Sequence, residues 1–178
     1  MSISHVFRPG ESTDAARAKE VQVVKPHQLD DNTPQTTGMR RLAAISQSRL
    51  GSEALWAGIM IAEPNTASSV HHHGSLETVV YVVAGMSKVR WGNRLEHEVD
   101  LEAGDFVLIP PYVPHQEINP SPDKPTQWVV VRSGPESVVV NLTKAPNGEY
   151  VADDFDESES SNEILFGTER TEQTTIGG

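Results

Sequence analysis

His71-His72-His73-Gly74-Ser75-Leu76-Glu77 and, about forty residues later, Pro110-Pro111-Tyr112-Val113-Pro114-His115 carry most of what this chain reveals about its fold and its chemistry. Alternate residues of a β-strand point to the same side, so His71 and His73 face one interior while His72 faces away. A tight turn returns Glu77 to that side, and His115 ends a second apolar run. Imidazole nitrogens and a carboxylate suit a divalent first-row metal, so this pattern predicts a metal site inside a β-structure.

The rest of the chain from Met39 onward alternates short apolar stretches with turn residues. Candidate strands cover residues 41–46, 55–61, 70–73, 78–83, 87–91, 96–101, 106–109, 115–118, 127–132 and 138–142. Many short strands, Gly and Pro turns and no long helical period indicate an all-β sandwich or barrel. We expect an irregular N-terminal arm over residues 1–36, a barrel over 37–145 and an acidic tail over 146–178.

Composition narrows the class of protein. A chain of 178 residues is long enough for one domain with a core of its own, and without cysteine it has neither disulfides nor a thiolate metal site. The net charge of −11 argues against nucleic acid, although residues 153–178 hold eight acids against Arg170 alone. No apolar run is long enough for a membrane span and no signal peptide is visible, so we expect a cytoplasmic protein.

Two spaced motifs carry a family resemblance. The first is Asn65, five residues, His71-x-His73, three residues, Glu77, seven residues and Gly85; the second is Gly104, five residues, Pro110-x-Tyr112, two residues, His115, three residues and Asn119. Together they resemble the two motifs of the cupin superfamily. The resemblance covers roughly residues 40–145 and implies a single double-stranded β-helix, the jelly roll of cupins, with a metal bound by His71, His73, Glu77 and His115.

The chain departs from the family motifs at three places. Asn65 replaces a turn glycine, which is mild because Asn tolerates positive φ. Tyr112 replaces a second glycine, so we expect that turn to differ and the ring to reach the pocket mouth. Counting from His73 selects Glu77 as the carboxylate ligand, whereas counting back from Gly85 selects Thr78. A one-residue β-bulge reconciles the counts, and we favour Glu77; if it points outward, the site is three histidines and water.

Several other residues are candidates for catalytic or substrate-binding roles at this site. Strand parity from Glu77 places Tyr81 inward. Glu117 is either a general base or a hydrogen-bond partner of a ligating histidine. Arg132 either clamps a substrate carboxylate or marks a strand end, and Arg40 and Arg41 are weaker candidates of the same kind. Trp91 and Trp128 line a cavity or pack in the core.

The function expected from these residues is metal-dependent chemistry on a small organic molecule. Four protein ligands leave one or two positions of an octahedral ion open. Fe(II) with dioxygenase chemistry is favoured; Mn, Ni, Zn, Cu or Co with isomerase, lyase or cyclase chemistry is the alternative, and a non-catalytic small-molecule-binding cupin is a third. The valine runs 79–80 and 138–140 indicate strands buried on both faces, and cupins are commonly dimers, so we expect a homodimer.

Overall fold

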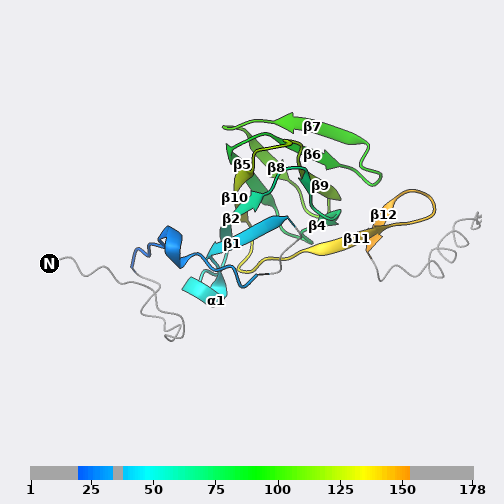
Figure 1. Ribbon diagram of the computed structural model, residues 1–178. Helices are drawn as coiled ribbons and strands as arrows, with labels where there is room; N and C mark the ends of the chain where they lie inside the picture. Colours follow the sequence, from blue (N-terminus) through cyan, green and yellow to red (C-terminus); the bar gives the residue numbers. More distant parts are fainter. Residues whose placement is uncertain (1–19, 34–37, 153–178) are drawn as a thin grey trace, which may run out of the picture.

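The computed structural model describes residues 20–33 and 38–152, and these residues form two antiparallel sheets (Figure 1). The first sheet has the order β1 (Met39–Ile45), β2 (Trp56–Ala62), β10 (Thr126–Arg132), β5 (Thr78–Ala84) and β8 (Phe106–Ile109). The second has the order β12 (Tyr150–Ala152), β11 (Val140–Lys144), β4 (His71–His72), β9 (His115–Asn119), β6 (Ser87–Trp91) and β7 (His97–Leu101), with β3 (Thr66–Ala67) beside β9. A 3₁₀ turn (Pro26–Gln28) and the four-residue helix α1 (Gln47–Leu50) complete the described elements.

The strand order confirms the double-stranded β-helix. The chain passes repeatedly from one sheet to the other, so strands far apart in sequence lie side by side, as β10 does between β2 and β5. The predicted all-β jelly roll is therefore correct. Within the described residues, no helix has the length and apolar character needed to cross a membrane.

The core lies between the two sheets because their strands alternate in burial. Along β2 and β10 every second residue is buried, which is the period-2 pattern of a strand with one face in the core. The largest apolar cluster consists of Met39, Ala43, Trp56, Met60, Ala62, Val80, Val82, Ile109, Trp128 and Val130. All of these belong to the first sheet, and the second sheet contributes polar groups to the interior.

The second sheet continues beyond the predicted end of the barrel. Residues 146–152 were assigned to the tail, but β12 pairs with β11 and the Tyr150 backbone N–H donates to the Asn93 carbonyl at 2.7 Å. Tyr150 and Ala152 also pack on a small cluster formed by Val70, Leu95 and Leu142. The remainder of the predicted tail, residues 153–178, and residues 1–19 of the arm lie outside the described residues.

The two turns with replaced glycines keep a left-handed backbone. Asn65 has φ 54°, as expected for a residue that tolerates this region, and Tyr112 has φ 59°. Tyr112 therefore takes a left-handed conformation that glycine adopts readily and bulky residues rarely adopt. Its backbone N–H donates to the Gly74 carbonyl at 2.9 Å, which ties the turn to the histidine-bearing segment, and its exposed ring lies against His72.

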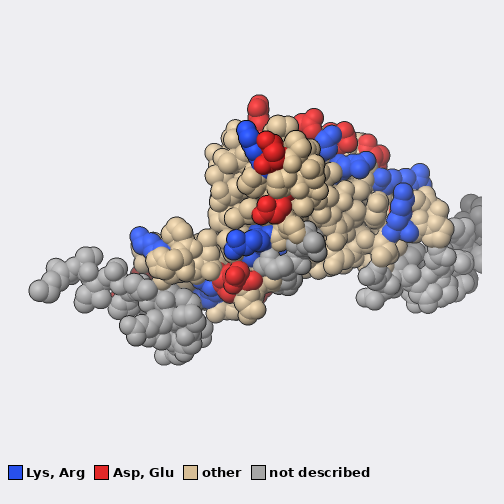
Figure 2. All heavy atoms as spheres, in the orientation of Figure 1, with Lys and Arg blue, Asp and Glu red and all other residues tan. Residues whose placement is uncertain are grey.

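Charged side chains gather along the edge formed by β6 and β7 (Figure 2). Lys88 on β6 lies 2.8 Å from Glu98 and 3.4 Å from Asp100, both on β7. Glu98 also pairs with Arg90. Exposed ion pairs of this kind contribute little stability, so this edge is a solvated surface.

Candidate metal centre

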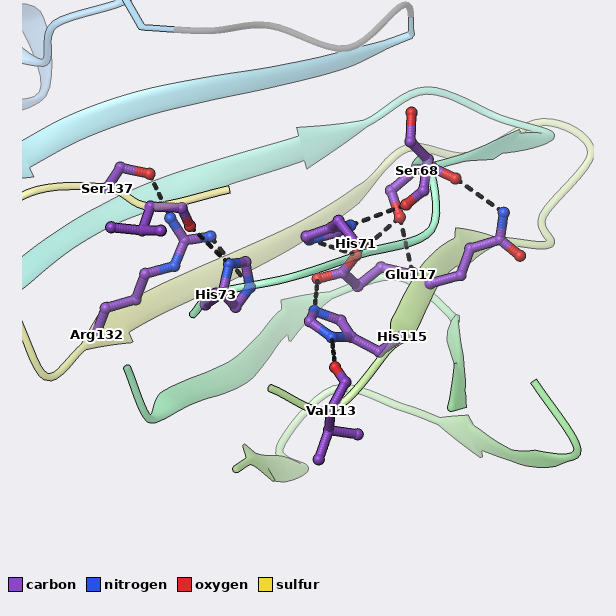
Figure 3. A network of polar contacts seen from close by, with 11 residues as sticks. Ser68, His71, His73, Val113, His115, Glu117, Arg132 and Ser137 are labelled. Atoms are coloured by element: carbon purple, nitrogen blue, oxygen red, sulfur yellow. Dashed lines mark hydrogen bonds and ion pairs between the residues drawn. The ribbon is translucent and has the colours of Figure 1, made fainter. Parts of the chain in front are cut away.

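Four buried side chains converge on the inner face of the second sheet: His71, His73, His115 and Glu117 (Figure 3). Strand pairing sets His71 directly opposite His115, and the two-residue period of β9 places Glu117 on the same side as His115. One potential ligand atom from each residue lies within 4.8 Å of the others. The three predicted histidines are therefore brought together as expected.

The three imidazoles are held in one tautomer by the backbone. The Nδ1 atoms of His71, His73 and His115 lie 2.8, 2.9 and 2.8 Å from the carbonyl oxygens of Ser69, Val138 and Val113. Because a carbonyl only accepts, each Nδ1 carries the proton and each Nε2 presents a lone pair to the centre. The Nε2 atom of His115 is buried and has no hydrogen-bond partner among the described residues, as a metal ligand requires.

Glu117 is positioned by Ser68. The Ser68 hydroxyl donates to Glu117 Oε2 at 2.9 Å and accepts the Glu117 backbone N–H at 3.0 Å. The carboxylate oxygens then lie 3.8 Å from His71 Nε2 and 3.6 Å from His115 Nε2. These distances are too long for hydrogen bonds, so the four groups surround a common point without bonding one another.

The protonation states suit metal binding. Burial, more than the nearby charge of Arg132, lowers the pKa of His73 to about 2, and burial also lowers the pKa of His71. Both rings are therefore neutral at pH 7. Burial alone would raise the pKa of Glu117, but the surrounding imidazoles and the Ser68 hydroxyl hold it below its usual value, so Glu117 is ionised. The neutral imidazoles of His71 and His73, the unpartnered Nε2 of His115 and one carboxylate fit a divalent first-row ion.

Arg132 is the last residue of β10, as one sequence interpretation expected, but it is 1% exposed and lies beside the cluster, so it does more than end a strand. Its guanidinium lies over the Trp56 ring at 5.1 Å from the centroid, one Nη donates to Ser137, and the other lies 3.4 Å from His73 Nε2. Burial, followed by the charge of buried Arg41, lowers the pKa of Arg132 to about 10, so it stays cationic at pH 7.

Glu77 lies outside the cluster, contrary to expectation. Its side chain is exposed, whereas Thr78 is buried at the start of β5 and pairs with Arg132. The irregularity in β5 falls at Val83, opposite Gln127 and Trp128, too far along the strand to re-aim Glu77. The carboxylate of the site is instead that of Glu117, for which the position two residues after His115 on a strand was the available signal.

Tyr81 is also displaced from the site, for the same reason. Because Thr78 points inward, Val80 and Val82 follow it, and Tyr81 faces outward against the Phe106 ring at 4.6 Å. A shift of one residue in a strand moves every side chain to the other face. Trp128 packs in the core, while Trp91 lines a cavity. The contribution of Ser68 had no signal in the sequence motifs.

An apolar cavity of about 260 Å³ borders the cluster at His115. Its other lining residues come from β6, β7, β8 and the segment that follows β8: Val89, Trp91, Val99, Val107, Leu108, Ile109, Pro110 and Val113. One water molecule occupies about 30 Å³ in liquid water, so the cavity is large enough for an organic group. The site thus combines a polar ligand set with an apolar compartment, as small-molecule sites commonly do.

Comparison with known proteins agrees with this architecture. Residues 58–132 match the model of the cupin domain, and this span includes all four residues of the cluster. No curated protein matches. Residues 58–132 therefore form a cupin domain, and the described residues around them have the double-stranded β-helix fold.

Solved structures of similar fold come from proteins of diverse function. The polyketide cyclase RemF from Streptomyces resistomycificus is 17% identical with a TM-score of 0.59, over 72% of this chain and 90% of that one. KdgF from Halomonas sp. is 19% identical with a TM-score of 0.53, over 66% and 96%. A mutant of Bacillus subtilis oxalate decarboxylase is 16% identical with a TM-score of 0.54, over 60% and 29%. At these identities the likeness shows the fold alone.

The two candidate carboxylates make a matched pair for a test of the metal centre. We expect Glu117→Gln to lower metal retention by about tenfold or more, because the amide cannot neutralise a divalent ion. Glu77→Gln should leave retention unchanged, since Glu77 is exposed. Metal content after dialysis against a weak chelator, measured by plasma mass spectrometry, checks both; loss in the Glu77 variant with retention in the Glu117 variant would reverse the assignment.

Acid should destabilise the metal-free protein from about pH 6.5 downward. The pKa values of His71 and His73 are lowered in the folded chain, so below 6.5 the unfolded chain binds more protons and stability falls as the pH falls. Each buried imidazole contributes a slope of up to about 1.4 kcal/mol per pH unit.

Urea unfolding between pH 8 and pH 5 measures this slope. The His73→Gln variant should have a shallower slope, and a variant of the exposed His97, His97→Gln, should keep the wild-type slope. Equal unfolding free energies at pH 7.5 and pH 5 in the wild type would contradict the neutral, buried state of these rings.

Proposed function

We propose that this protein is a metal-dependent enzyme acting on a small organic molecule, with a divalent ion held by His71, His73, His115 and Glu117. The observation that carries the proposal is the set of three Nε2 lone pairs and one carboxylate, fixed by Nδ1 bonds to the backbone and bordered by an apolar cavity. A purely structural ion would not need a cavity beside its ligands, whereas a reacting substrate does.

Within this proposal we favour ferrous iron and dioxygenase chemistry. A divalent ion supplies Lewis-acid polarisation of a substrate oxygen, and ferrous iron adds the redox chemistry that dioxygen needs. The described polar side chains placed next to the ligands are cations, hydroxyls and an amide: Arg41, Arg132, Ser68, Ser69, Thr78 and Asn141. None of them accepts a proton readily at neutral pH, which favours activation by the ion over general-base chemistry. The oxalate decarboxylase of similar fold contains Mn(II), so manganese with lyase or isomerase chemistry is the second candidate.

Metal analysis followed by a reaction screen tests these alternatives. We expect protein loaded anaerobically with Fe(II) to consume dioxygen with one member of a panel of phenols, diketones and hydroxy acids. Protein loaded with Mn(II) should then be inactive with the same compound. Conversion without dioxygen would favour the isomerase and lyase alternative, and binding without conversion would leave a non-catalytic cupin.

We also propose a homodimer formed through the outer face of the first sheet. One apolar row crosses all five strands of this face: Leu42, Ile59, Val129, Tyr81 and Phe106. Four strands of seven residues and one of four, about 4.8 Å apart, present roughly 500 Å² to a second copy. Two such faces approach the lower limit of stable interfaces, about 1,200 Å² in total, so a second copy of this sheet fits better than a short peptide.

A substitution of Phe106 tests the dimer without touching the metal site. Phe106 is 73% exposed, so Phe106→Glu should leave the barrel folded and convert dimers to monomers in sedimentation. Val99→Glu, a similar change at a 41% exposed position on β7, should leave the dimer intact. A wild-type monomer, or a dimer broken only by the β7 change, would rule out this interface.

A further inference from the structure

Arg132 is an interior cation whose donors are only partly used. One Nη donates to Ser137, the other, Nη2, donates to His73 Nε2 at 3.4 Å, and Nε has no hydrogen-bond partner within the described part of the chain. The Trp56 ring lies against the guanidinium, 5.1 Å from its Cζ to the ring centroid, and a ring face accepts no N–H donor bond in place of a carboxylate. Burial of a charged donor without a partner is unfavourable, so the Nε of Arg132 needs an explanation.

This inference rests on the proposed function, in which the cluster holds a metal ion. Metal binding removes His73 Nε2 as a hydrogen-bond acceptor for Arg132. His73 Nε2 has one lone pair, and an ion held by His73 uses it. Nη2 then loses its acceptor as well. Nε–H and Nη2–H lie on the same edge of the planar guanidinium, so the loaded site presents two parallel, unpaired donors. That edge matches the two oxygens of a carboxylate.

The charge around the site also calls for an anion. Glu117 is the one acid that the structure places in the cluster, and two buried arginines, Arg41 and Arg132, lie within electrostatic range of it. A divalent ion added to this set leaves a buried excess of positive charge. Buried charge is unfavourable away from water, so an anionic ligand that offsets this positive charge is stabilised at the site.

The apolar cavity accounts for the rest of the ligand. It touches His115, whose ring centroid lies 4.9 Å from that of His73, and His73 is the residue that Arg132 contacts. We propose that the substrate is a small organic carboxylate, with its carboxylate on the Nε/Nη2 edge of Arg132 beside the metal and its apolar part in the cavity next to His115.

A matched pair of ligands tests the proposal on the wild-type protein. Hexanoate and hexanamide have the same shape and differ in charge, and acetate lacks the apolar chain. With Mn(II)-loaded protein, titration calorimetry should show hexanoate binding about tenfold to 100-fold more tightly than hexanamide, the range expected for a charge-assisted pair. Acetate should bind more weakly than hexanoate. Equal affinities for hexanoate and hexanamide would overturn the proposal. Tight binding of inorganic phosphate without binding of hexanoate would overturn it as well.

Substitutions of Arg132 locate the effect. Arg132→Gln should abolish the preference for hexanoate over hexanamide, and Arg132→Lys should retain only part of it, since an ammonium lacks the planar fork. Arg40→Gln, an exposed arginine on β1, should behave as the wild type. A full preference in folded Arg132→Gln would also overturn the assignment, and the wild-type comparison stands even where a variant fails to fold.

Metal content measured on the same samples separates a failure of the proposed metal-dependent function from a failure of the proposed substrate class. Wild-type protein that holds no metal at the cluster contradicts the proposed function. Protein that holds Mn(II) but does not distinguish acid from amide contradicts the substrate class alone. The Mn(II) electron paramagnetic resonance spectrum gives a further readout, because a carboxylate bound next to the ion should change it in the wild type and not in Arg132→Gln.

Discussion

The hydrogen bonds from three Nδ1 atoms to backbone carbonyls are the constraint on which the site depends. Each fixes a tautomer and a ring orientation, and together they aim three lone pairs at one point. The acceptors Ser69, Val138 and Val113 belong to segments adjoining β4, β11 and β9, and these strands are neighbours in one sheet. The jelly roll therefore supplies the second layer of the site directly from its backbone, with no need for a dedicated carboxylate behind each histidine.

The sequence predicted the fold and the three histidines because both depend on local spacing. In a His-x-His pair on a strand, alternation alone places both side chains on one face, and a histidine directly after a proline turn marks the start of the next strand. The carboxylate was harder to assign, because between His73 and β5 the chain passes through a turn, with Gly74 at φ 59°. A count across a turn does not fix parity. An error of one residue sent Glu77 inward and Tyr81 with it, whereas β9 has no turn between His115 and Glu117, so alternation alone places Glu117 correctly.

Contacts between distant segments could not be read from the sequence. Ser68 reaches Glu117 from a loop 49 residues away, and Val138 meets His73 across 65 residues. Tyr112 shows the opposite limit, since a residue that normally avoids positive φ occupies a glycine conformation there. The turn is held by tertiary contacts, among them its bond to the Gly74 carbonyl, and these outweigh the local preference.

Residues that are not metal ligands fix the position of Arg132 beside the site. A Cβ at Gly58 would lie 2.7 Å from the Trp56 ring and 2.5 Å from the Leu42 carbonyl oxygen, so only glycine leaves room for this ring at that place. The ring in turn carries the Arg132 guanidinium, and Arg132 meets His73. A cation–π contact stabilises the charge without consuming its N–H donors. Had a carboxylate taken the place of Trp56, the donors would be occupied; with an aromatic ring, the cation is held in the interior and remains available to an anion.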